Sequence, residues 1–218
     1  MSKKKIAVIL SGCGVYDGSE IHEATLSLLA IQQAGAEYEI FAPSIIQHQV
    51  VNHLTGETMD QERNVLVESA RIARGKISDL ATFDGNKFDG ILLPGGYGAA
   101  KNLSDFAVKG ADCDVIPDLV NALNQMYLLA KPIGALCIAP AIVARVIKGA
   151  TATIGNGAGA SETFSKMGAK HFITDKPEIV IDKEHCIVSA PCYMLDANLV
   201  DIAESALGVV KAMLDFCR

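Results

Sequence analysis

The sequence predicts an α/β fold, a doubly wound sandwich of three layers around a mostly parallel central sheet. Short apolar runs recur along the chain and end in glycine or proline, which is typical of strands buried on both faces. Segments with apolar residues at helical spacing separate these runs. Strands that alternate with helices in this way form parallel sheets.

The first strand–helix–strand unit lies near the start of the chain. Residues 6–10 form an apolar run, residues 20–33 carry the helical spacing, and residues 37–42 predict the next strand. Because the two strands flank one helix, we expect them to be parallel neighbours.

The rest of the chain repeats this pattern after an irregular stretch. Residues 45–73 predict a hairpin and a helix added to an edge of the sheet. The further expected elements are strands over 90–93 and 133–136, helices over 115–129, from 139, up to 167 and over 195–216, a glycine-rich loop over 155–159 and a hairpin over 179–189. We therefore expect one domain over 1–218 with an edge insertion over about 45–73.

Composition limits the class of partner. The chain has 218 residues, half of them hydrophobic, which is enough for one sizeable core. Its net charge of −6 leaves no basic face for phosphates, so nucleic acid and anionic membrane surfaces are poor partners. A small polar substrate fits this charge better.

Neither targeting nor cross-linking is indicated. The apolar run after the charged start is too short for a signal peptide or a membrane span, so we expect a cytoplasmic protein. The six cysteines show no C-x-x-C pair, which argues against a disulfide framework or a structural zinc site. We expect free thiols, and no metal or other cofactor.

Cys137 is the sharpest feature of the sequence. It follows the strand expected over 133–136 and precedes Pro140, which suits the first turn of a helix. Such a strand-to-helix elbow exposes its side chain at the end of the sheet, where ligands bind in open α/β folds. Backbone N–H groups and the helix N-terminus are expected to lower the pKa of the thiol. A small buried core cysteine is the alternative.

The segment Pro94-Gly95-Gly96 ends the neighbouring expected strand. Glycines there let main-chain N–H groups approach a substrate oxygen. Gly95 and Gly96 are therefore candidates for an oxyanion hole, together with the N–H of Ile138. Taken alone, the segment is an ordinary turn.

Two carboxyl groups, Glu20 and Glu23, open the first expected helix on the same rim as Cys137. A carboxyl group at this place can bond the thiol. Either one alone is better explained as a favourable partner of the helix dipole.

Four further residues are candidates for the cleft. His22 follows in the same turn as the two glutamates, and His53 lies in the edge insertion; capping or solvent exposure is the alternative for both. Cys13 and Cys192 also follow strand ends, although their spacing carries no metal signature.

The order of these motifs resembles the PfpI-like, class I glutamine-amidotransferase-like superfamily, which includes deglycases and glyoxalase III enzymes. The resemblance runs from Ile6 to the last helix and is carried by Glu23, Pro94-Gly95-Gly96 and Ala135-Leu136-Cys137-Ile138-Ala139-Pro140. It implies a flavodoxin-like fold in which Glu23 bonds Cys137, and in which Gly96 and Ile138 supply the oxyanion amides. Relatives are commonly homodimers, and residues 45–73 are the segment we expect at such an interface.

Two longer strings, residues 10–23 and 98–104, resemble the ElbB group, which is associated with isoprenoid biosynthesis. The second string contains Asn102, a further candidate for the pocket. Some members of this group are credited with converting glyoxal to glycolate without glutathione. The resemblance therefore implies a glyoxalase-like or deglycase activity that needs no cofactor.

The chain also departs from related enzymes. PfpI-type peptidases carry a histidine directly after the nucleophile, where this chain has Ile138. Class I glutaminases need a late His-x-Glu pair, and none follows Cys137. The deglycases carry a histidine near the position of Ile154-Gly155. Peptidase and glutaminase activities are therefore disfavoured, and Glu23 is expected to act alone.

These residues predict a cofactor-independent glyoxalase, a lyase that acts on small 2-oxoaldehydes such as glyoxal and methylglyoxal. Cys137 would attack the aldehyde carbon to give a hemithioacetal, whose oxygen the amides of Gly96 and Ile138 hold. Glu23 would orient the thiol and shuttle a proton between the two carbons before water releases a 2-hydroxy acid. The alternatives are a non-catalytic redox or carbonyl-stress sensor or chaperone with an oxidisable Cys137, and an accessory protein of isoprenoid biosynthesis.

Overall fold

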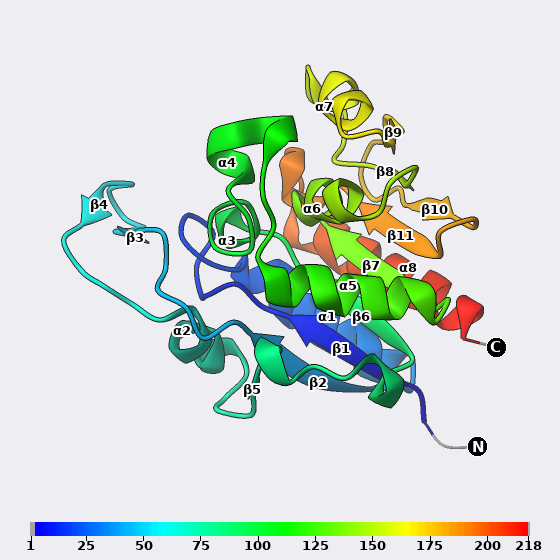
Figure 1. Ribbon diagram of the computed structural model, residues 1–218, viewed down its shortest axis with the longest axis horizontal. Helices are drawn as coiled ribbons and strands as arrows, with labels where there is room; N and C mark the ends of the chain where they lie inside the picture. Colours follow the sequence, from blue (N-terminus) through cyan, green and yellow to red (C-terminus); the bar gives the residue numbers. More distant parts are fainter. Residues whose placement is uncertain (1–2, 218) are drawn as a thin grey trace.

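A seven-stranded sheet runs through the centre of the molecule in the computed structural model, which describes residues 3–217 (Figure 1). Its strands are β1 (Lys5–Ile9), β2 (Glu37–Ala42), β5 (Ser78–Asp79), β6 (Gly90–Leu93), β7 (Ile133–Leu136), β10 (Val180–Asp182) and β11 (Ile187–Ala190). They lie in the order β10-β11-β7-β6-β1-β2-β5. Within the described residues, every neighbouring pair is parallel except β10 and β11.

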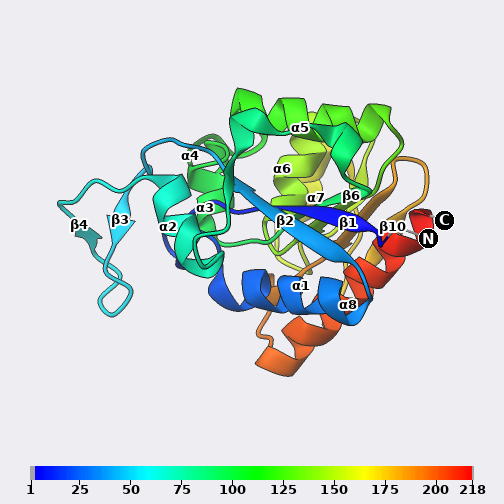
Figure 2. The same ribbon diagram turned by 90° about the horizontal axis from the view of Figure 1, so that it is seen from below.

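Helices cover both faces of this sheet (Figure 2). On one face lie α1 (Ile21–Gln33) and α8 (Leu199–Phe216), and on the other lie α5 (Pro117–Leu128) and α6 (Ala139–Val146). The residues of β1 alternate between the two cores, since Ile6 and Val8 pack with α1 and α8, whereas Ala7 and Ile9 pack with α5 and α6. The predicted three-layer fold with a mostly parallel sheet is confirmed.

Two small sheets flank the central one. β3 (Val50–Val51) pairs antiparallel with β4 (Thr58–Met59), and this hairpin projects from the molecule beside α2 (Val65–Ile72) (Figures 1 and 2). β8 (Thr151–Ala152) and β9 (Lys170–His171) pair in parallel near α7 (Ala160–Lys166). The expected hairpin within 45–73 is present, but it does not join the sheet. β5 takes the edge position instead, and its two residues are too few to give a sequence pattern.

The closing helix differs from its expected range at the start. It begins at Leu199 and not near residue 195, because Asn198 caps it: the Asn198 side chain accepts from the backbone N–H groups of Val200 and Asp201, and the Asp201 carboxylate bonds the Asn198 N–H in return. Two short helices, α3 (Tyr97–Lys101) and α4 (Phe106–Lys109), were not predicted. No helix within residues 3–217 combines the length and the apolar character needed to cross a membrane.

The topology gathers four turns at one end of the sheet. β1, β6, β7 and β11 run parallel, so their carboxyl ends meet there. The turn after β1 covers residues 11–19, the turn after β6 covers 94–96, the elbow after β7 begins at Cys137, and a 3₁₀ turn, η4 (Cys192–Met194), follows β11.

Candidate active site

Cys137 has a backbone conformation that side chains rarely adopt. Its φ is +59°, and it stands between the last residue of β7 and the start of α6. This left-handed conformation is strained for a residue other than glycine and turns the chain sharply from strand to helix. The Cys137 N–H donates to the carbonyl of Ala190, 2.9 Å away on β11, which holds the elbow in place.

Glycines let the neighbouring turn approach Cys137 closely. A methyl group at Gly95 would lie 2.3 Å from Cys137 Cβ and 2.7 Å from Glu23 Oε2, so any larger residue would displace this pair. Gly96 has a φ of +97° and caps α3. Its N–H and that of Ile138 both donate toward the Cys137 sulfur, from two different turns.

Glu23 is fully buried next to Cys137. It belongs to the first turn of α1. Oε2 accepts from the Gly95 N–H at 3.0 Å, Oε1 accepts from the Tyr193 N–H at 3.2 Å, and the carboxyl group also bonds the Cys137 side chain. Burial, aided by the nearby Glu20 carboxylate, raises the pKa of Glu23 from 4.5 to about 8. The carboxyl group is therefore mostly protonated at neutral pH.

The predicted lowering of the thiol pKa is wrong. Burial raises the pKa of Cys137 well above the ordinary value, and the charge of Glu23 raises it further; the amides of Gly96 and Ile138 oppose this shift without overcoming it. Two negative charges cannot be held side by side in this dry environment. At neutral pH the resting pair is thus a thiol beside a protonated carboxyl group, and one negative charge appears near pH 8.

Cys137 opens into a cavity of about 360 Å³. The cavity lies at the carboxyl end of the sheet and is mostly apolar. Its lining residues are Val15, Glu20, Gly96, Tyr97, Ala100, Phe106, Ala107, Cys137, Ile138, Tyr193 and Met194. Glu23 is not among them. The predicted role of Glu23 as a shuttle between substrate carbons therefore has no geometric basis, although its contact with the thiol does.

Glu20 both caps α1 and lines the cavity. Its Oε2 accepts from the Glu23 backbone N–H at 2.7 Å, which is the usual contact of an N-cap side chain. His22 stands beside it with Nδ1 3.9 Å from Glu20 Oε1. The same Nδ1 is 3.0 Å from the Tyr193 hydroxyl, so His22 lies at the rim and contacts the cavity through Tyr193.

Two of the candidate residues hold the turns around the site but do not line it. Asn102 is buried, and its amide donates to the carbonyls of Ser11 and Asp17 at 2.8 Å each. His53 accepts from the Tyr16 N–H at 3.2 Å on the outer side of the turn after β1. Both residues therefore support the conformation of that turn. His53 does not line the cavity, so the expectation that it reaches the cleft is wrong.

The two other strand-end cysteines are also outside the cavity. Cys192 is buried in the same core cluster as Cys137, with its sulfur near the Cys137 backbone N–H. Cys13 is partly exposed near the charges of Glu68 and Arg71 on α2. Within residues 3–217, no three histidine, cysteine or acidic side chains gather as a metal-binding set.

The sequence reasoning missed most of the cavity wall. Tyr193 and Met194 belong to η4, and Tyr97 and Phe106 belong to α3 and α4. Tyr193 follows a strand end, and that position is the one signal that could have drawn attention to it.

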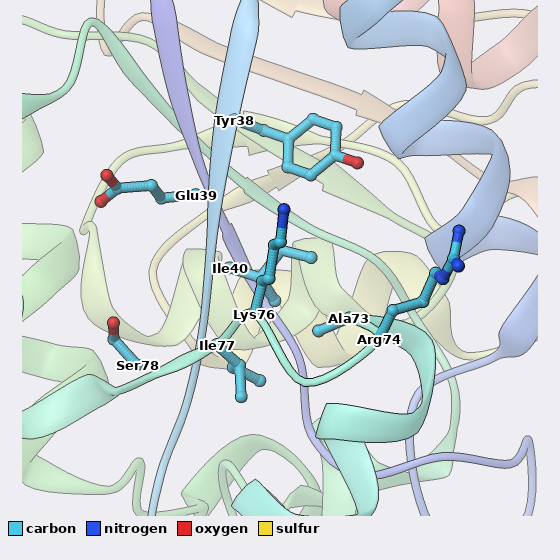
Figure 3. Close-up of a pocket in the computed structure, with 8 residues that line it drawn as sticks. All are labelled: Tyr38, Glu39, Ile40, Ala73, Arg74, Lys76, Ile77 and Ser78. Carbon is cyan, nitrogen blue, oxygen red and sulfur yellow. The ribbon is translucent and has the colours of Figure 1, made fainter.

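A larger hollow of about 680 Å³ lies near the β5 edge of the sheet, between β2 and residues 73–78 (Figure 3). Glu39, Arg74 and Lys76 line it, and all three are exposed. Exposed charges are solvated, so this hollow lacks a buried thiol bonded to a carboxyl group, the feature that distinguishes the Cys137 cavity.

Comparisons with known proteins agree with the fold and the motifs. A rat protein named "ES1 protein homolog, mitochondrial" is 43% identical over 223 residues, covering 98% of this chain and 84% of the rat protein. The human "Glutamine amidotransferase-like class 1 domain-containing protein 3, mitochondrial" is 42% identical over 221 residues, covering 97% of this chain and 82% of the human protein. No model of a protein family matches the chain.

Solved structures give the same result. An isoprenoid biosynthesis protein with an amidotransferase-like domain from Ehrlichia chaffeensis superposes with a TM-score of 0.93 at 36% identity, covering 99% of this chain and all of that one. Drosophila melanogaster DJ-1beta superposes with a TM-score of 0.55 at 15% identity, covering 99% and 96%, and shows a shared fold alone.

The expected cytoplasmic location is contradicted by the names of the relatives. The rat and human proteins, and a zebrafish ES1 protein that is 32% identical, are all named as mitochondrial. The expectation rested on an apolar run too short for a signal peptide or a membrane span, and that observation does not test for a mitochondrial location. From its identity to the ES1 proteins over nearly all of its length, the chain belongs to the ES1 family of class I glutamine-amidotransferase-like proteins, with the DJ-1/ThiJ/PfpI fold.

Proposed function

We propose that the chain is a cofactor-independent glyoxalase that converts 2-oxoaldehydes such as glyoxal and methylglyoxal to 2-hydroxy acids. One observation carries the proposal: a strained elbow presents Cys137 to a cavity, with Glu23 bonded to the thiol and the amides of Gly96 and Ile138 aimed at the sulfur. An aldehyde carbon bonded to that sulfur would place its oxygen near the same two amides.

The first step uses the single negative charge of the Cys137–Glu23 pair. As the sulfur bonds the aldehyde carbon, Glu23 receives the thiol proton and the carbonyl electron pair moves to the oxygen. Gly96 and Ile138 stabilise this oxygen through their N–H groups. Because burial raises the pKa of Glu23 to about 8, the charged form grows as pH rises through that value, and the rate should rise with it.

The site is poorly suited to amide hydrolysis. A leaving amine needs a proton donor with access to the bound substrate, which a histidine after the nucleophile supplies in related peptidases. Here Ile138 occupies that position and lines the cavity with an apolar side chain. An aldehyde has no leaving amine, so its addition to the thiol does not require this donor.

A redox sensor is the second candidate. The protonated Glu23 carboxyl group favours it, because this group could donate a hydrogen bond to an oxygen of an oxidised Cys137. A sensor would gain about 32 Da, two oxygen atoms, on peroxide treatment and would turn over no aldehyde.

The test is 2-hydroxy acid formation from glyoxal and methylglyoxal at pH 7 to 9. Wild type, Cys137→Ser and Glu23→Gln would be compared, with Cys217→Ser as a control for a cysteine outside the cavity. We expect Cys137→Ser to lose turnover completely and Cys217→Ser to keep it. Turnover by Cys137→Ser at the rate of the wild type would exclude the proposed mechanism.

A further inference from the structure

The proposed reaction needs a second proton carrier. After Cys137 has bonded the aldehyde carbon, C1, a proton must leave C1 and another must reach the adjacent carbon, C2. The group that moves this proton must touch the bound substrate. Glu23 does not line the cavity, and both of its oxygens accept backbone N–H groups, from Gly95 and Tyr193. It can exchange a proton with the thiol but not with the substrate carbons.

Glu20 has the position that Glu23 lacks. Its Oε2 is occupied by the capping contact with the Glu23 N–H, but Oε1 belongs to a side chain that lines the cavity beside Cys137. The carboxylate is largely buried, and the capping contact fixes its orientation. A fixed carboxylate oxygen in an apolar cavity is a suitable base for a carbon acid.

Tyr193 supplies a hydroxyl group to the same cavity. Tyr193 lines the cavity from η4, and its hydroxyl lies 3.0 Å from Nδ1 of His22. The His22 side chain is 56% exposed, so it can exchange protons with bulk water. His22 and Tyr193 thus form a short chain from solvent to a phenol group whose residue lines the same cavity as Cys137.

We propose that Glu20 carries the proton from C1 to C2 of the bound 2-oxoaldehyde, that Tyr193 donates to the C2 oxygen, and that His22 positions Tyr193 and renews its proton. Glu20 and Tyr193 are then catalytic residues, and His22 is a positioning residue. This inference rests on the proposed function.

The steps balance as follows in atoms and charge. Glu20 takes the C1 proton of the hemithioacetal, the C1–H electron pair forms a C1–C2 double bond, and the C2 carbonyl pair moves to oxygen, which takes the Tyr193 proton. Glu20 then returns its proton to C2, and the C1 oxygen forms a carbonyl group. The product is a thioester of Cys137 with a 2-hydroxy acid.

Water completes the cycle. It attacks C1 of the thioester, the C1–S bond breaks, and the sulfur recovers its proton from Glu23. The second proton of the attacking water passes through solvent and His22 to the Tyr193 oxygen, where it replaces the proton that Tyr193 gave to the substrate, and the product leaves as the 2-hydroxy acid. The net change is the addition of one water to the 2-oxoaldehyde, with no oxidant or reductant.

The test separates thiol chemistry from the carbon-to-carbon proton transfer. Turnover of methylglyoxal is measured beside the rate at which iodoacetamide alkylates Cys137. Glu20→Gln keeps an oxygen that can cap α1, so the fold should persist; thermal unfolding would check this. We expect its kcat to fall about 100-fold or more, the usual contribution of a general base, while alkylation of Cys137 stays within a few-fold of wild type. Glu20→Asp, which keeps both carboxylate and cap, should recover part of kcat.

The other two residues need their own readouts. Tyr193→Phe should lower kcat about tenfold or more with little change in KM. His22→Ala should lower kcat, and added imidazole should restore part of it, since the site of His22 is open to solvent. Glu62→Gln and Tyr127→Phe, exposed residues outside the cavity, are the matched controls and should behave as wild type.

The two possible failures are distinguishable. A wild type that turns over no 2-oxoaldehyde would overturn the proposed function and, with it, this inference. A wild type that is active, together with a Glu20→Gln variant of equal kcat, would overturn the assignment of Glu20 alone. Loss of both turnover and Cys137 alkylation in Glu20→Gln would also overturn it, since Glu20 would then act on the thiol.

Discussion

Cys137 and Cys192 follow the ends of two neighbouring strands, β7 and β11, and differ in their access to the cavity. Both have a positive φ, +59° and +46°, and both are buried in the same core cluster. Burial is the largest cause of a raised pKa in each, and the charge of Glu23 is the second. Cys137 lines the cavity beside the amides of Gly96 and Ile138, whereas Cys192 lies outside it. Both sulfurs have backbone N–H donors, so access to the cavity distinguishes Cys137 from Cys192, and the direction of the pKa shift does not.

The largest expected effect is in alkylation. We expect iodoacetamide at pH 8 to label Cys137 roughly 1,000-fold faster than Cys192, because the reagent can enter the cavity but reaches Cys192 only after local opening of the core. Peptide mass spectrometry over a time course measures both sites in one sample. Equal rates would remove the distinction between the two cysteines.

Glu23 raises the pKa of both cysteines when it is charged. Its own ionisation should make the free energy of unfolding depend on pH. Since burial raises its pKa from 4.5 to about 8, the folded protein binds this proton more tightly than the unfolded chain. The resulting stabilisation is complete below pH 4.5 and is lost as pH rises to 8. Between pH 5 and 8, Glu23→Gln should therefore gain up to about 4 kcal/mol in unfolding free energy relative to wild type. Urea denaturation at both pH values measures it; a difference that does not change with pH would contradict the burial of an ionisable Glu23.

A substitution at Gly95 tests the close contact between this residue and Cys137, which Cys192 does not share. Gly95→Ala should destabilise the protein by about 2 kcal/mol, because the new methyl group must displace Cys137 and Glu23. It should also slow alkylation of Cys137 without exposing Cys192. Gly157→Ala is the matched control, since a methyl group there meets nothing within 4 Å. If both variants had the same stability and the same alkylation rate, the turn at residues 94–96 could accept a methyl group without displacing Cys137.

The smallest expected effect concerns the apolar wall around Cys137. Val15, Phe106 and Ile138 line a cavity of about 360 Å³, so a longer alkyl group on the 2-oxoaldehyde should be buried on binding. We expect kcat/KM to rise about fourfold for each added methylene from methylglyoxal onward, in line with the burial of one methylene group. Steady-state kinetics over the series provides the measurement, and a flat or falling series would show that the alkyl group stays in water.

Most of the fold was predictable from the sequence. The bounds of β6 and β7 agree with the apolar runs, because a strand buried on both faces leaves a continuous pattern with clear ends. β5, with two residues, and α4, with four, are too short to show any period, and their place is set by tertiary contacts.

The candidate site was predictable where it depends on strand ends. Cys137, Gly96 and Glu23 follow strands or open a helix, so topology alone brings them together. Tyr193 depends on β11 lying beside β7, which nothing near residue 193 indicates. The direction of the Cys137 pKa depends on how completely the fold excludes water from the pair, and no local pattern reports that.

Asn102 gives the projecting hairpin a link to the cavity. Its side chain binds the Asp17 carbonyl and also accepts from the His48 N–H at 2.9 Å, and the Asp17 carboxylate accepts from the Val51 N–H at 2.8 Å. The turn that carries Val15 to the cavity wall and the base of the β3–β4 hairpin thus share one set of hydrogen bonds. We therefore expect these segments to open together, as one cooperative unit, in a hydrogen-exchange experiment. A partner protein that binds the β3–β4 hairpin would therefore change how often the turn at Val15 opens the cavity beside Cys137.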